Sequence, residues 1–294
     1  KFPSCSNFCH YNLKCRNTFL LMNINRNTTS VISNTNSISF CNSYINVIAM
    51  PSKRLIDRVV HWMGEPKQEH RTGIGFPAIG EPKGYTQIGS AKGDLDKDGV
   101  PERVIVYNTE KRGMAVAAGT GDEVAGGTDR EIRIYKAGAD SWELWHSSIG
   151  AVQPSEANGP EGGEPFASIA VERGALVIGH KAEADAQEGA DVHRFRYQDG
   201  AFHLIGVTTS WYAPCMNEIT FDYNLSTGRA TYKYEEETCR PGTETPSGRT
   251  ALIDEVFTNK IDQLPKMDGY RINRQTIMAP FDIIPDYEER EIYF

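Results

Sequence analysis

The acidic stretch Gly93–Glu102, with the sequence GDLDKDGVPE, constrains this chain more than any other. Asp94, Asp96 and Asp98 alternate along it, and Glu102 closes it before an apolar run. Carboxylates at alternate positions repel one another in a bare loop, so we expect a cation among them. Calcium takes about six to eight oxygen ligands and suits carboxylates, a backbone carbonyl and water on one tight turn. The stretch therefore predicts a Ca²⁺ loop.

The spacing also excludes one kind of calcium loop. An EF-hand needs a bidentate Glu at its twelfth position, and counted from Asp94 that position is Ile105. Gly99 supplies the positive φ that a tight turn requires. The alternative to an ion site is a solvated acidic turn, because Asp and Gly are common turn residues anyway.

Composition limits the class of protein. The chain has 294 residues, of which 39% are hydrophobic, enough for one large domain or two smaller ones. No run approaches the roughly 18 apolar residues of a membrane helix, so we expect no integral membrane segment. The formal net charge of -8 argues against a nucleic-acid partner, because phosphate binding needs a basic surface.

The N-terminal segment differs sharply from the rest. Residues 1–50 hold Lys and Arg but no acidic residue and no glycine, and they are rich in Asn and Ser. No C-x-x-C pair occurs among the cysteines there, Cys5, Cys9, Cys15 and Cys41. Such a polar tract cannot bury enough surface to order itself. We predict that residues 1–49 are disordered or a non-native extension, with Met50 as the real start; an independent Cys-rich arm is the alternative.

A helix is predicted at the start of the folded part. Four apolar side chains of residues 51–63 recur at helical spacing, and Gly64 follows as a stop. They are Leu55, Val59, Trp62 and Met63. Residues 65–84 are rich in Gly and Pro, which is typical of an irregular connection. Residues 50–84 are therefore expected to form a short helix and a connecting segment.

Residues 85–239 are predicted to form an all-β domain. Short alternating runs come in pairs that flank turns, which is typical of hairpins. The pairs are Tyr85–Ala91 with Arg103–Asn108, Glu131–Tyr135 with Trp142–Trp145, Phe166–Val171 with Ala175–Gly179, Val192–Tyr197 with Phe202–Val207, and Glu218–Tyr223 with Arg229–Tyr234. Without intervening helices they indicate an antiparallel meander of about ten strands. The Gly-rich segment Gly113–Gly127 is expected to be a mobile surface loop.

The acidic loop and the hairpin order resemble a known family. The pattern D-x-D-x-D-G-x-x-E runs straight into a strand. It resembles the calcium loop of FG-GAP/VCBS-type repeats, the module of integrin α-subunit propellers and many bacterial surface proteins. The hairpins that follow, up to the turn YNLSTGR, look like bacterial single-domain proteins of this class. The similarity spans about residues 85–234.

The loop pattern implies a set of ligands. Side-chain oxygens would come from the four acids and a backbone carbonyl from Val100. This chain departs from the family in one respect: the acidic loop occurs once, whereas integrin-type propellers repeat it from blade to blade. About ten strands cannot close a ring of seven four-stranded blades. We therefore expect an open meander, curled or sandwich-like, and propeller-like closure stays unproven.

Cys215 and Cys239 bracket the last predicted hairpin. Residues equally distant from a hairpin turn lie close together, so a disulfide is geometrically plausible; two unpaired thiols are the alternative. An oxidised pair would place the domain outside the cytosol, in the periplasm or secreted. Asn224-Leu225-Ser226 on the same hairpin fits a glycosylation acceptor, which a eukaryotic secretory route would use.

Residues 240–294 are predicted to form an irregular C-terminal tail that wraps the domain. Leu252–Phe257 fits a helical turn or an edge strand, and Ile261 with Leu264 favours the helix. The rest of the tail alternates apolar anchors with acids.

Catalytic motifs are sparse. The strand histidines His146, His180, His193 and His203 form no H-E-x-x-H pattern, and neither a G-x-S-x-G elbow nor a phosphate-binding P-loop is present. Acid pairs such as Asp222 with Glu218, or Glu235 with Glu237, would suit a glycosidase only at a suitable separation. The aromatic residues Trp142, Trp145, Trp211 and Tyr212 can form a sugar-stacking platform, although such residues more often belong to a sheet core.

Three functions remain open from sequence. The first is a non-enzymatic, Ca²⁺-stabilised extracytoplasmic β module for binding or adhesion, with a protein or carbohydrate ligand. The second is a secreted or periplasmic hydrolase that acts on polysaccharide with paired carboxylates. The third is a secreted effector or inhibitor with a protein partner, which needs a large exposed apolar patch.

Overall fold

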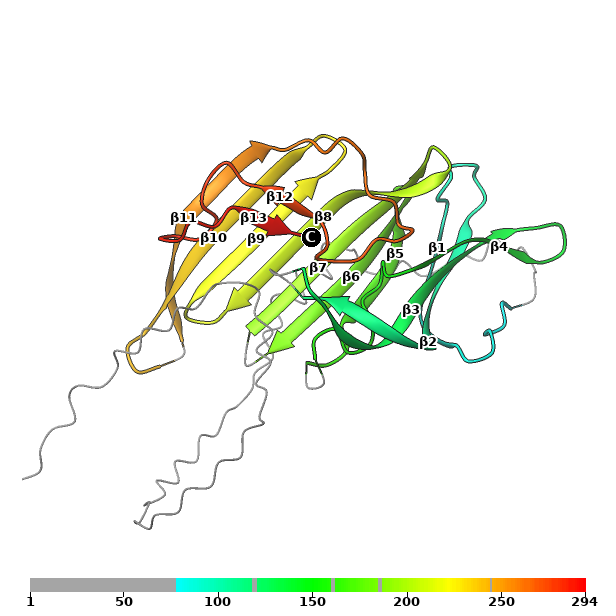
Figure 1. The fold of residues 1–294 in the computed structure, drawn as a ribbon, viewed down its shortest axis with the longest axis horizontal. Coiled ribbons are helices and arrows are strands. Elements are labelled where there is room, and N and C mark those ends of the chain that lie inside the picture. The colour runs from blue at the N-terminus through cyan, green and yellow to red at the C-terminus, as the bar shows by residue number, and fades with distance from the viewer. Residues whose placement is uncertain (1–77, 118–120, 160–161, 185–186, 244) are drawn as a thin grey trace, which may run out of the picture.

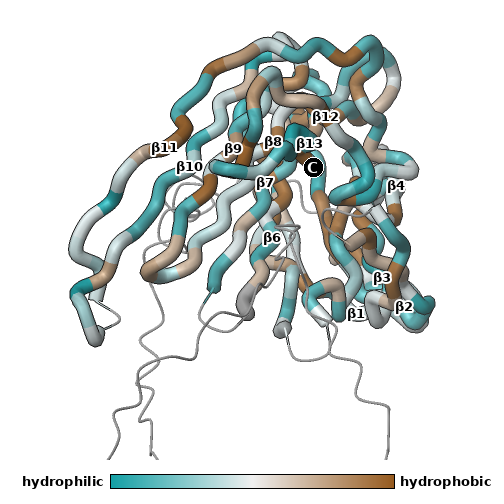
Figure 2. Tube along the Cα trace, turned by 60° about the vertical axis from the view of Figure 1, so that its left-hand side comes forward, coloured by the Kyte–Doolittle hydropathy of each residue, from teal (hydrophilic) through white to brown (hydrophobic). Residues whose placement is uncertain are grey.

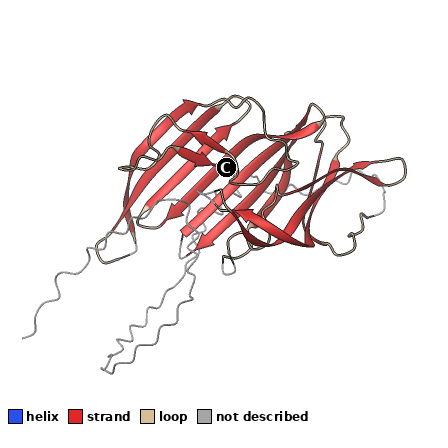
Figure 3. Ribbon diagram, in the orientation of Figure 1, coloured by secondary structure: helices blue, strands red, loops and turns tan. Residues whose placement is uncertain are grey.

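The fold is all-β wherever the chain is described. The computed structural model describes residues 78–117, 121–159, 162–184, 187–243 and 245–294. These residues form antiparallel sheets of four, seven and two strands, none of them closed, and contain no helix (Figure 3). The all-β prediction is therefore confirmed. The predicted helix at 51–63 and the predicted extension 1–49 lie outside the described residues.

The strands follow one another in sequence order (Figure 1). The four-stranded sheet contains β1 (Thr86–Gly93), β2 (Glu102–Val116), β3 (Glu123–Ala137) and β4 (Trp142–Ile149). The seven-stranded sheet contains β5 (Phe166–Glu172), β6 (Ala175–Ala184), β7 (Gln187–Gln198), β8 (Ala201–Ala213), β9 (Asn217–Asn224), β10 (Arg229–Cys239) and β11 (Pro246–Thr258). The small sheet pairs β12 (Thr276–Met278) with β13 (Glu291–Tyr293). All five predicted hairpins are present.

Turn chemistry sets the register of two hairpins. Arg173-Gly174 joins β5 to β6, and Asp199-Gly200 joins β7 to β8, each as a two-residue loop. All four residues have positive φ, between 51° and 79°. Two-residue turns with positive φ at both positions match the right-handed twist of the flanking strands, and a glycine in the second position adopts this conformation without strain.

The prediction of a mobile loop at Gly113–Gly127 is wrong for most of that segment. β2 and β3 continue through it, with Met114 paired to Ala125 and Val116 to Glu123. Two of its glycines, Gly113 and Gly126, allow close packing against Pro154. A Cβ on Gly126 would lie 2.5 Å from Cγ of Pro154, which packs on the hairpin. Glycine in a strand often marks such a close approach to a neighbouring residue.

The helical preference for Leu252–Phe257 is also wrong, because this segment belongs to the edge strand β11. Ile253 pairs with Tyr234 and Phe257 with Ala230 on β10. A spacing of four residues fits both a helical face and the alternation of a strand, so the apolar pattern alone did not separate them. A register shift opposite Tyr234/Glu235 interrupts the pairing of β11 with β10. Such irregularities in edge strands limit edge-to-edge pairing between molecules.

The two large sheets meet where β1 packs against β5. A Cβ on Gly93 would lie 2.5 Å from Cγ1 of Val171, and one on Gly89 would lie 2.8 Å from the ring of Phe166. Two glycines therefore allow the strands to approach closely. In Figure 2 the two sheets form the flanks of an arch. This open, curled arrangement agrees with the predicted meander.

The C-terminal tail supplies the second layer of the core. It crosses the face of β8–β10 (Figure 1), where Phe294 stacks edge-on against Tyr223, with 5.6 Å between ring centroids. Tyr232 donates a hydrogen bond to the carbonyl oxygen of Ile283 at 2.9 Å. Tail side chains in the main buried cluster are Met267, Tyr270, Ile272, Ile277, Ala279, Ile283, Ile284, Ile292 and Phe294.

Two histidines lie deep in this core. His193 on β7 is 0% exposed, and neither ring nitrogen has a hydrogen-bond partner. His180 on β6 lies beside His193, with 6.0 Å between ring centroids. The tail residue Tyr270 also packs against His193, with 5.6 Å between ring centroids. Burial, with a smaller effect of the Arg194 charge, lowers the pKa of His193 to about 3. The core therefore holds this imidazole in its neutral form.

Acid should destabilise the fold through His193. The unfolded chain binds this proton below pH ~6.5, whereas the folded chain binds it only near pH 3. Stability should therefore fall as pH drops through that window, by about 1.4 kcal/mol per pH unit from this group. Urea unfolding of the wild type and His193→Leu between pH 7 and pH 4 isolates the contribution, since other titrating groups largely cancel. The variant should gain stability relative to the wild type as pH falls, and parallel curves would contradict the assignment.

Candidate metal site

The acidic stretch forms the turn between β1 and β2. Its first and last residues, Gly93 and Glu102, are paired at the turn end of the hairpin. One carboxylate oxygen from each of Asp94, Asp96 and Glu102 lies within 4.8 Å of the others. Glu102 is buried and the two aspartates are partly exposed. Three of the four predicted acidic ligands are thus brought together as a possible metal-binding group.

Backbone hydrogen bonds shape the turn. Asp94 accepts from the N–H of Lys97 at 2.6 Å and from that of Gly99 at 3.1 Å. Lys97 and Gly99 both have positive φ, which curls the chain around the Asp94 carboxylate. The N–H of the buried Leu95 donates to Oε2 of Glu102 at 2.7 Å. Leu95 is 1% exposed and belongs to the main core, so it anchors the polar turn to the apolar interior.

Asp98 and Val100 sit differently from the other predicted ligands. Asp98 is exposed and stands outside the group of three. Its Oδ1 accepts a hydrogen bond from the N–H of Val100 at 2.7 Å. The side chain of Val100 is exposed. The carbonyl of Val100 and the carboxylate of Asp98 therefore stay predicted ligands.

A lysine side chain already provides a positive charge at this turn. Lys136, near the end of β3, forms an ion pair and hydrogen bond with Oδ2 of Asp96. Its ammonium also lies 4.0 Å from the ring centroid of Trp145, a favourable cation–π distance. The expectation of a cation among the acids is thus met in part by the protein itself. Sequence reasoning missed Lys136 because 40 residues separate it from Asp96.

The charges of the turn shift the pKa values of its residues. Burial raises the pKa of Glu102, and the nearby charge of Asp96 adds to this effect, so the pKa lies above its usual value although the Leu95 N–H opposes it. Burial also raises the pKa of Asp96, but hydrogen bonds from Lys136 and the Asp98 backbone outweigh it and lower the pKa overall. The turn thus favours a charged Asp96 beside a Glu102 that is easier to protonate.

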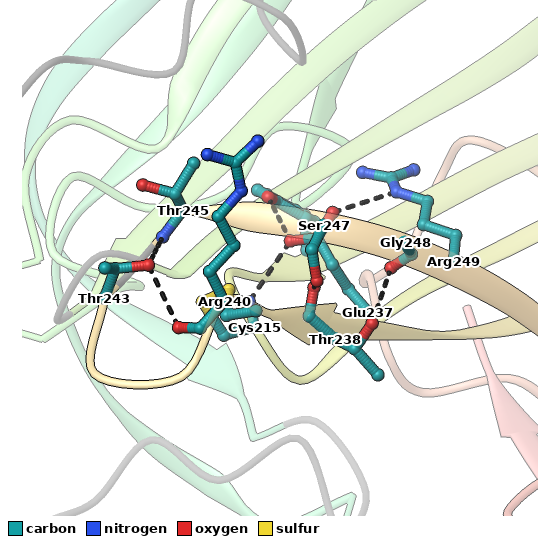
Figure 4. Close-up of a disulfide and its surroundings, with 11 residues drawn as sticks. Cys215, Glu237, Thr238, Arg240, Thr243, Thr245, Ser247, Gly248 and Arg249 are labelled. Atoms are coloured by element: carbon teal, nitrogen blue, oxygen red, sulfur yellow. Dashed lines mark hydrogen bonds and ion pairs between the residues drawn. A yellow bond between two sulfur atoms is a disulfide. The ribbon is translucent and has the colours of Figure 1, made fainter.

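The second predicted site is a disulfide between Cys215 and Cys239 (Figure 4). The Cα atoms are 5.2 Å apart, and the bridge joins the segment before β9 to the last residue of β10. It lies beside Glu237, whose Oε2 accepts from the N–H of Cys215 at 3.1 Å. Cys215 has a positive φ of 61°, so the bridge and this hydrogen bond hold a backbone conformation that is uncommon outside glycine.

Arg249 of β11 pairs with acidic side chains near the disulfide. Its Nε donates to Glu237 at 2.9 Å, and its Nη1 pairs with Glu218 and lies 3.8 Å from Glu235. Tyr212 also donates to Glu237 at 2.7 Å. Burial raises the pKa of Glu237, but the Tyr212, Cys215 and Arg249 hydrogen bonds outweigh it and lower the pKa overall. Sequence reasoning did not identify Arg249 as the partner of these acids.

The remaining candidate residues are scattered. Asp222 accepts from Thr208 at 2.8 Å, apart from the Arg249 cluster. Trp145 packs against Tyr197 and Phe202 next to the core, with ring centroids 4.5 and 5.4 Å apart, while Trp142 lies in a separate cluster under Arg103. The structure therefore gives no sign that the four predicted aromatic residues share one sugar-stacking surface.

The histidines also have separate surroundings. His146 pairs with Asp268 at 3.0 Å, and His203 lies 3.3 Å from the carbonyl oxygen of Leu264. His180 and His193 are buried in the core. Among the described residues, the only grouping of three or more potential metal-binding side chains is the acidic turn.

Comparisons with protein-family models, curated proteins and solved structures found no match. Within the part of the chain that the structure describes, no helix has the length and apolar character needed to cross a membrane.

Removing the disulfide should destabilise the domain. It closes a loop with a sequence separation of 24, for which loop-closure entropy corresponds to about 3.5 kcal/mol. The Cys215→Ser/Cys239→Ser variant should therefore unfold at lower urea concentration than the wild type. Dithiothreitol should lower the midpoint of the wild type but not of the variant. Two free thiols at these positions in the native protein, found by alkylation and peptide mapping, would contradict the bridge.

Arg249→Met should leave buried acids without their cation. Glu218 and Glu237 side chains are 5% and 2% exposed, whereas Arg249 is 34% exposed. We expect a loss of roughly 2–3 kcal/mol, below that for a fully buried pair because solvent screens the arginine. Arg240→Met, at an exposed arginine in the adjacent turn, is the matched control and should change stability by less than ~0.5 kcal/mol. Equal effects of the two substitutions in urea unfolding would rule out this role.

Proposed function

We propose that this chain is a non-enzymatic, calcium-stabilised β module that acts outside the cytosol in binding or adhesion. The observation that supports it is the convergence of Asp94, Asp96 and Glu102 on one turn between two strands. An ion there would bridge the end of β1 to the start of β2. It would also relieve the repulsion among three carboxylates that the fold brings within 4.8 Å.

The donor set favours a hard cation. All three side chains offer carboxylate oxygens, which suit Ca²⁺ and Mg²⁺ rather than soft metals that prefer Cys or His. Mg²⁺ demands near-ideal octahedral geometry, whereas Ca²⁺ accepts more ligands in a flexible arrangement. This turn is exposed, and Asp98 and the Val100 carbonyl lie nearby in the sequence as further oxygen ligands. A flexible Ca²⁺ site therefore fits it better than an octahedral Mg²⁺ site. We therefore propose Ca²⁺ as the ion.

Lys136 would compete with the ion. Its ammonium pairs with Asp96, so a divalent cation must weaken this pair to use both oxygens of that carboxylate. The exchange would lower the affinity for Ca²⁺ relative to the same turn without the lysine. In the absence of Ca²⁺ the lysine would keep the turn partly neutralised and folded.

Calorimetric titration with CaCl₂ tests the site directly. The wild type should bind one Ca²⁺ per chain, and Asp96→Asn or Glu102→Gln should weaken binding at least tenfold, because each removes a charged ligand. Lys136→Met should bind more tightly than the wild type, because it removes the competing charge. Asp199→Asn, in the β7–β8 turn, is the matched control and should bind as the wild type does.

Stability gives a second measure. Calcium at about 100 times its dissociation constant should stabilise the fold by about 2.7 kcal/mol, and EDTA should reverse the gain. A melting temperature that EDTA leaves unchanged, together with the absence of Ca²⁺ heat, would refute the calcium proposal. Tighter binding of Mg²⁺ than of Ca²⁺ would refute the identity of the ion but not the site.

The proposed extracytoplasmic location and the proposed binding role do not depend on the acidic turn alone. The Cys215–Cys239 bridge favours an oxidising compartment, because disulfides are rare in the cytosol.

The proposed partner is a protein or a carbohydrate. Binding to immobilised polysaccharides and extracellular-matrix proteins should occur with Ca²⁺ and decrease in EDTA. Hydrolysis of a polysaccharide by the wild type, abolished in Glu218→Gln or Glu237→Gln, would instead support a hydrolase.

A further inference from the structure

The turn between β9 and β10 presents an Asn-Leu-Ser sequence at the protein surface. Asn224 is the last residue of β9, and Arg229 opens β10 directly opposite it. Asn224 and Ser226 are exposed, whereas Leu225 between them is 3% exposed and belongs to the main core. The N–H of Leu225 donates to the carbonyl oxygen of Ile205 at 3.0 Å. The turn is therefore anchored by its middle residue and offers the two outer residues to solvent.

The hydrogen bonds of Asn224 leave its amide nitrogen available. Its Oδ1 accepts from the N–H of Thr227 at 3.1 Å, and its backbone carbonyl accepts from the N–H of Gly228 at 2.8 Å. Both bonds use oxygens. Attachment of a group to Nδ2 keeps Oδ1 as a carbonyl acceptor, so modification would preserve the hydrogen bonds that form this turn.

The same hairpin carries the disulfide. Cys215 lies before β9 and Cys239 ends β10, so the bridge spans the strands that the Asn224 turn connects. Disulfides form in the secretory and extracellular compartments, and transfer of sugar to Asn-x-Ser/Thr takes place in the secretory route. The disulfide thus favours the environment in which the Asn224 acceptor sequence would be used.

We propose that Asn224 is an acceptor for an N-linked glycan. The inference rests on the extracytoplasmic location proposed above but not on calcium binding. The donor would be a polyprenyl-diphosphate-linked oligosaccharide bound by an oligosaccharyltransferase. Nδ2 of Asn224 attacks the anomeric carbon and forms the N–C bond, while the bond from that carbon to the diphosphate oxygen breaks. The polyprenyl diphosphate leaves with the bonding electrons, and the amide proton passes to a base of the transferase.

A glycan at this corner would be compatible with the fold. The β9–β10 turn lies at the end of its strands, and its glycan would extend into solvent from an exposed residue. Ser226 has an exposed side chain, so it can be replaced without disturbing the core contact of Leu225. This separation allows the acceptor sequence to be removed while Asn224 and its turn stay in place.

The test is secretion of the full chain from a eukaryotic cell behind a cleavable signal sequence. A second acceptor sequence, Asn27-Thr28-Thr29, occurs in the chain, so all variants carry Asn27→Gln. Secreted and cell-retained pools are treated with PNGase F in H₂¹⁸O, and the peptide containing Asn224 is examined by mass spectrometry. We expect conversion of Asn224 to ¹⁸O-labelled Asp, which marks a glycan that the enzyme released.

Matched variants identify the acceptor. Ser226→Ala should abolish the modification and Ser226→Thr should retain it, although Asn224 is present in both. An unmodified Asn224 in both pools, in cells that glycosylate a co-expressed reporter, would overturn the inference. If calcium binding persists in that protein, only the glycan proposal fails. If Asn224 is glycosylated but calcium does not bind, only the metal proposal fails.

Discussion

The architecture depends on covering one face of a curved antiparallel meander with the chain's own C-terminal tail. A half-exposed sheet would leave Tyr223, Tyr232 and their neighbours in water. Instead the tail residue Phe294 packs on Tyr223, and Tyr270 packs on Phe195 of β7; all four belong to the same buried cluster. Each fully buried large apolar side chain contributes about 1.5–3 kcal/mol relative to exposure. The tail is therefore a structural layer of the fold, and its hydrogen bonds to strand residues fix where it lies.

Buried and half-buried acids in this fold are neutralised by single cations from distant strands. Lys136 reaches Asp96 at the acidic turn, and Arg249 reaches Glu218 and Glu237 beside the disulfide. Arg130 shows the reverse arrangement, because its side chain is 0% exposed and pairs with the exposed Glu164. An acidic cluster is thus not by itself a sign of catalysis, because a partner can satisfy it. At the acidic turn Lys136 pairs with one of the three grouped carboxylates, that of Asp96.

Local patterns predicted the hairpins well because pairing between neighbouring strands is a short-range event. Alternation and turn residues such as Asp199-Gly200 indicated which strands pair and where the chain turns between them. The same patterns misread Gly113–Gly127, because the reason for Gly126 is its contact with Pro154, which no local pattern reveals. They also misread Leu252–Phe257, where a spacing of four residues fits helix and strand alike.

The sequence by itself determined the all-β class, the order of hairpins and the acidic turn, since each follows from neighbouring residues. It left the Cys215–Cys239 bridge open beside two unpaired thiols, and the structure contains the bridge. Tertiary structure alone decided which acids converge, because Asp98 accepts a hydrogen bond from the backbone N–H of Val100 while Glu102 is buried in the interior. It also decided which cation meets them, because Lys136 reaches Asp96 only when β3 pairs with β2. Ion pairs between strands depend on distances in space, and positions along the sequence do not give those distances.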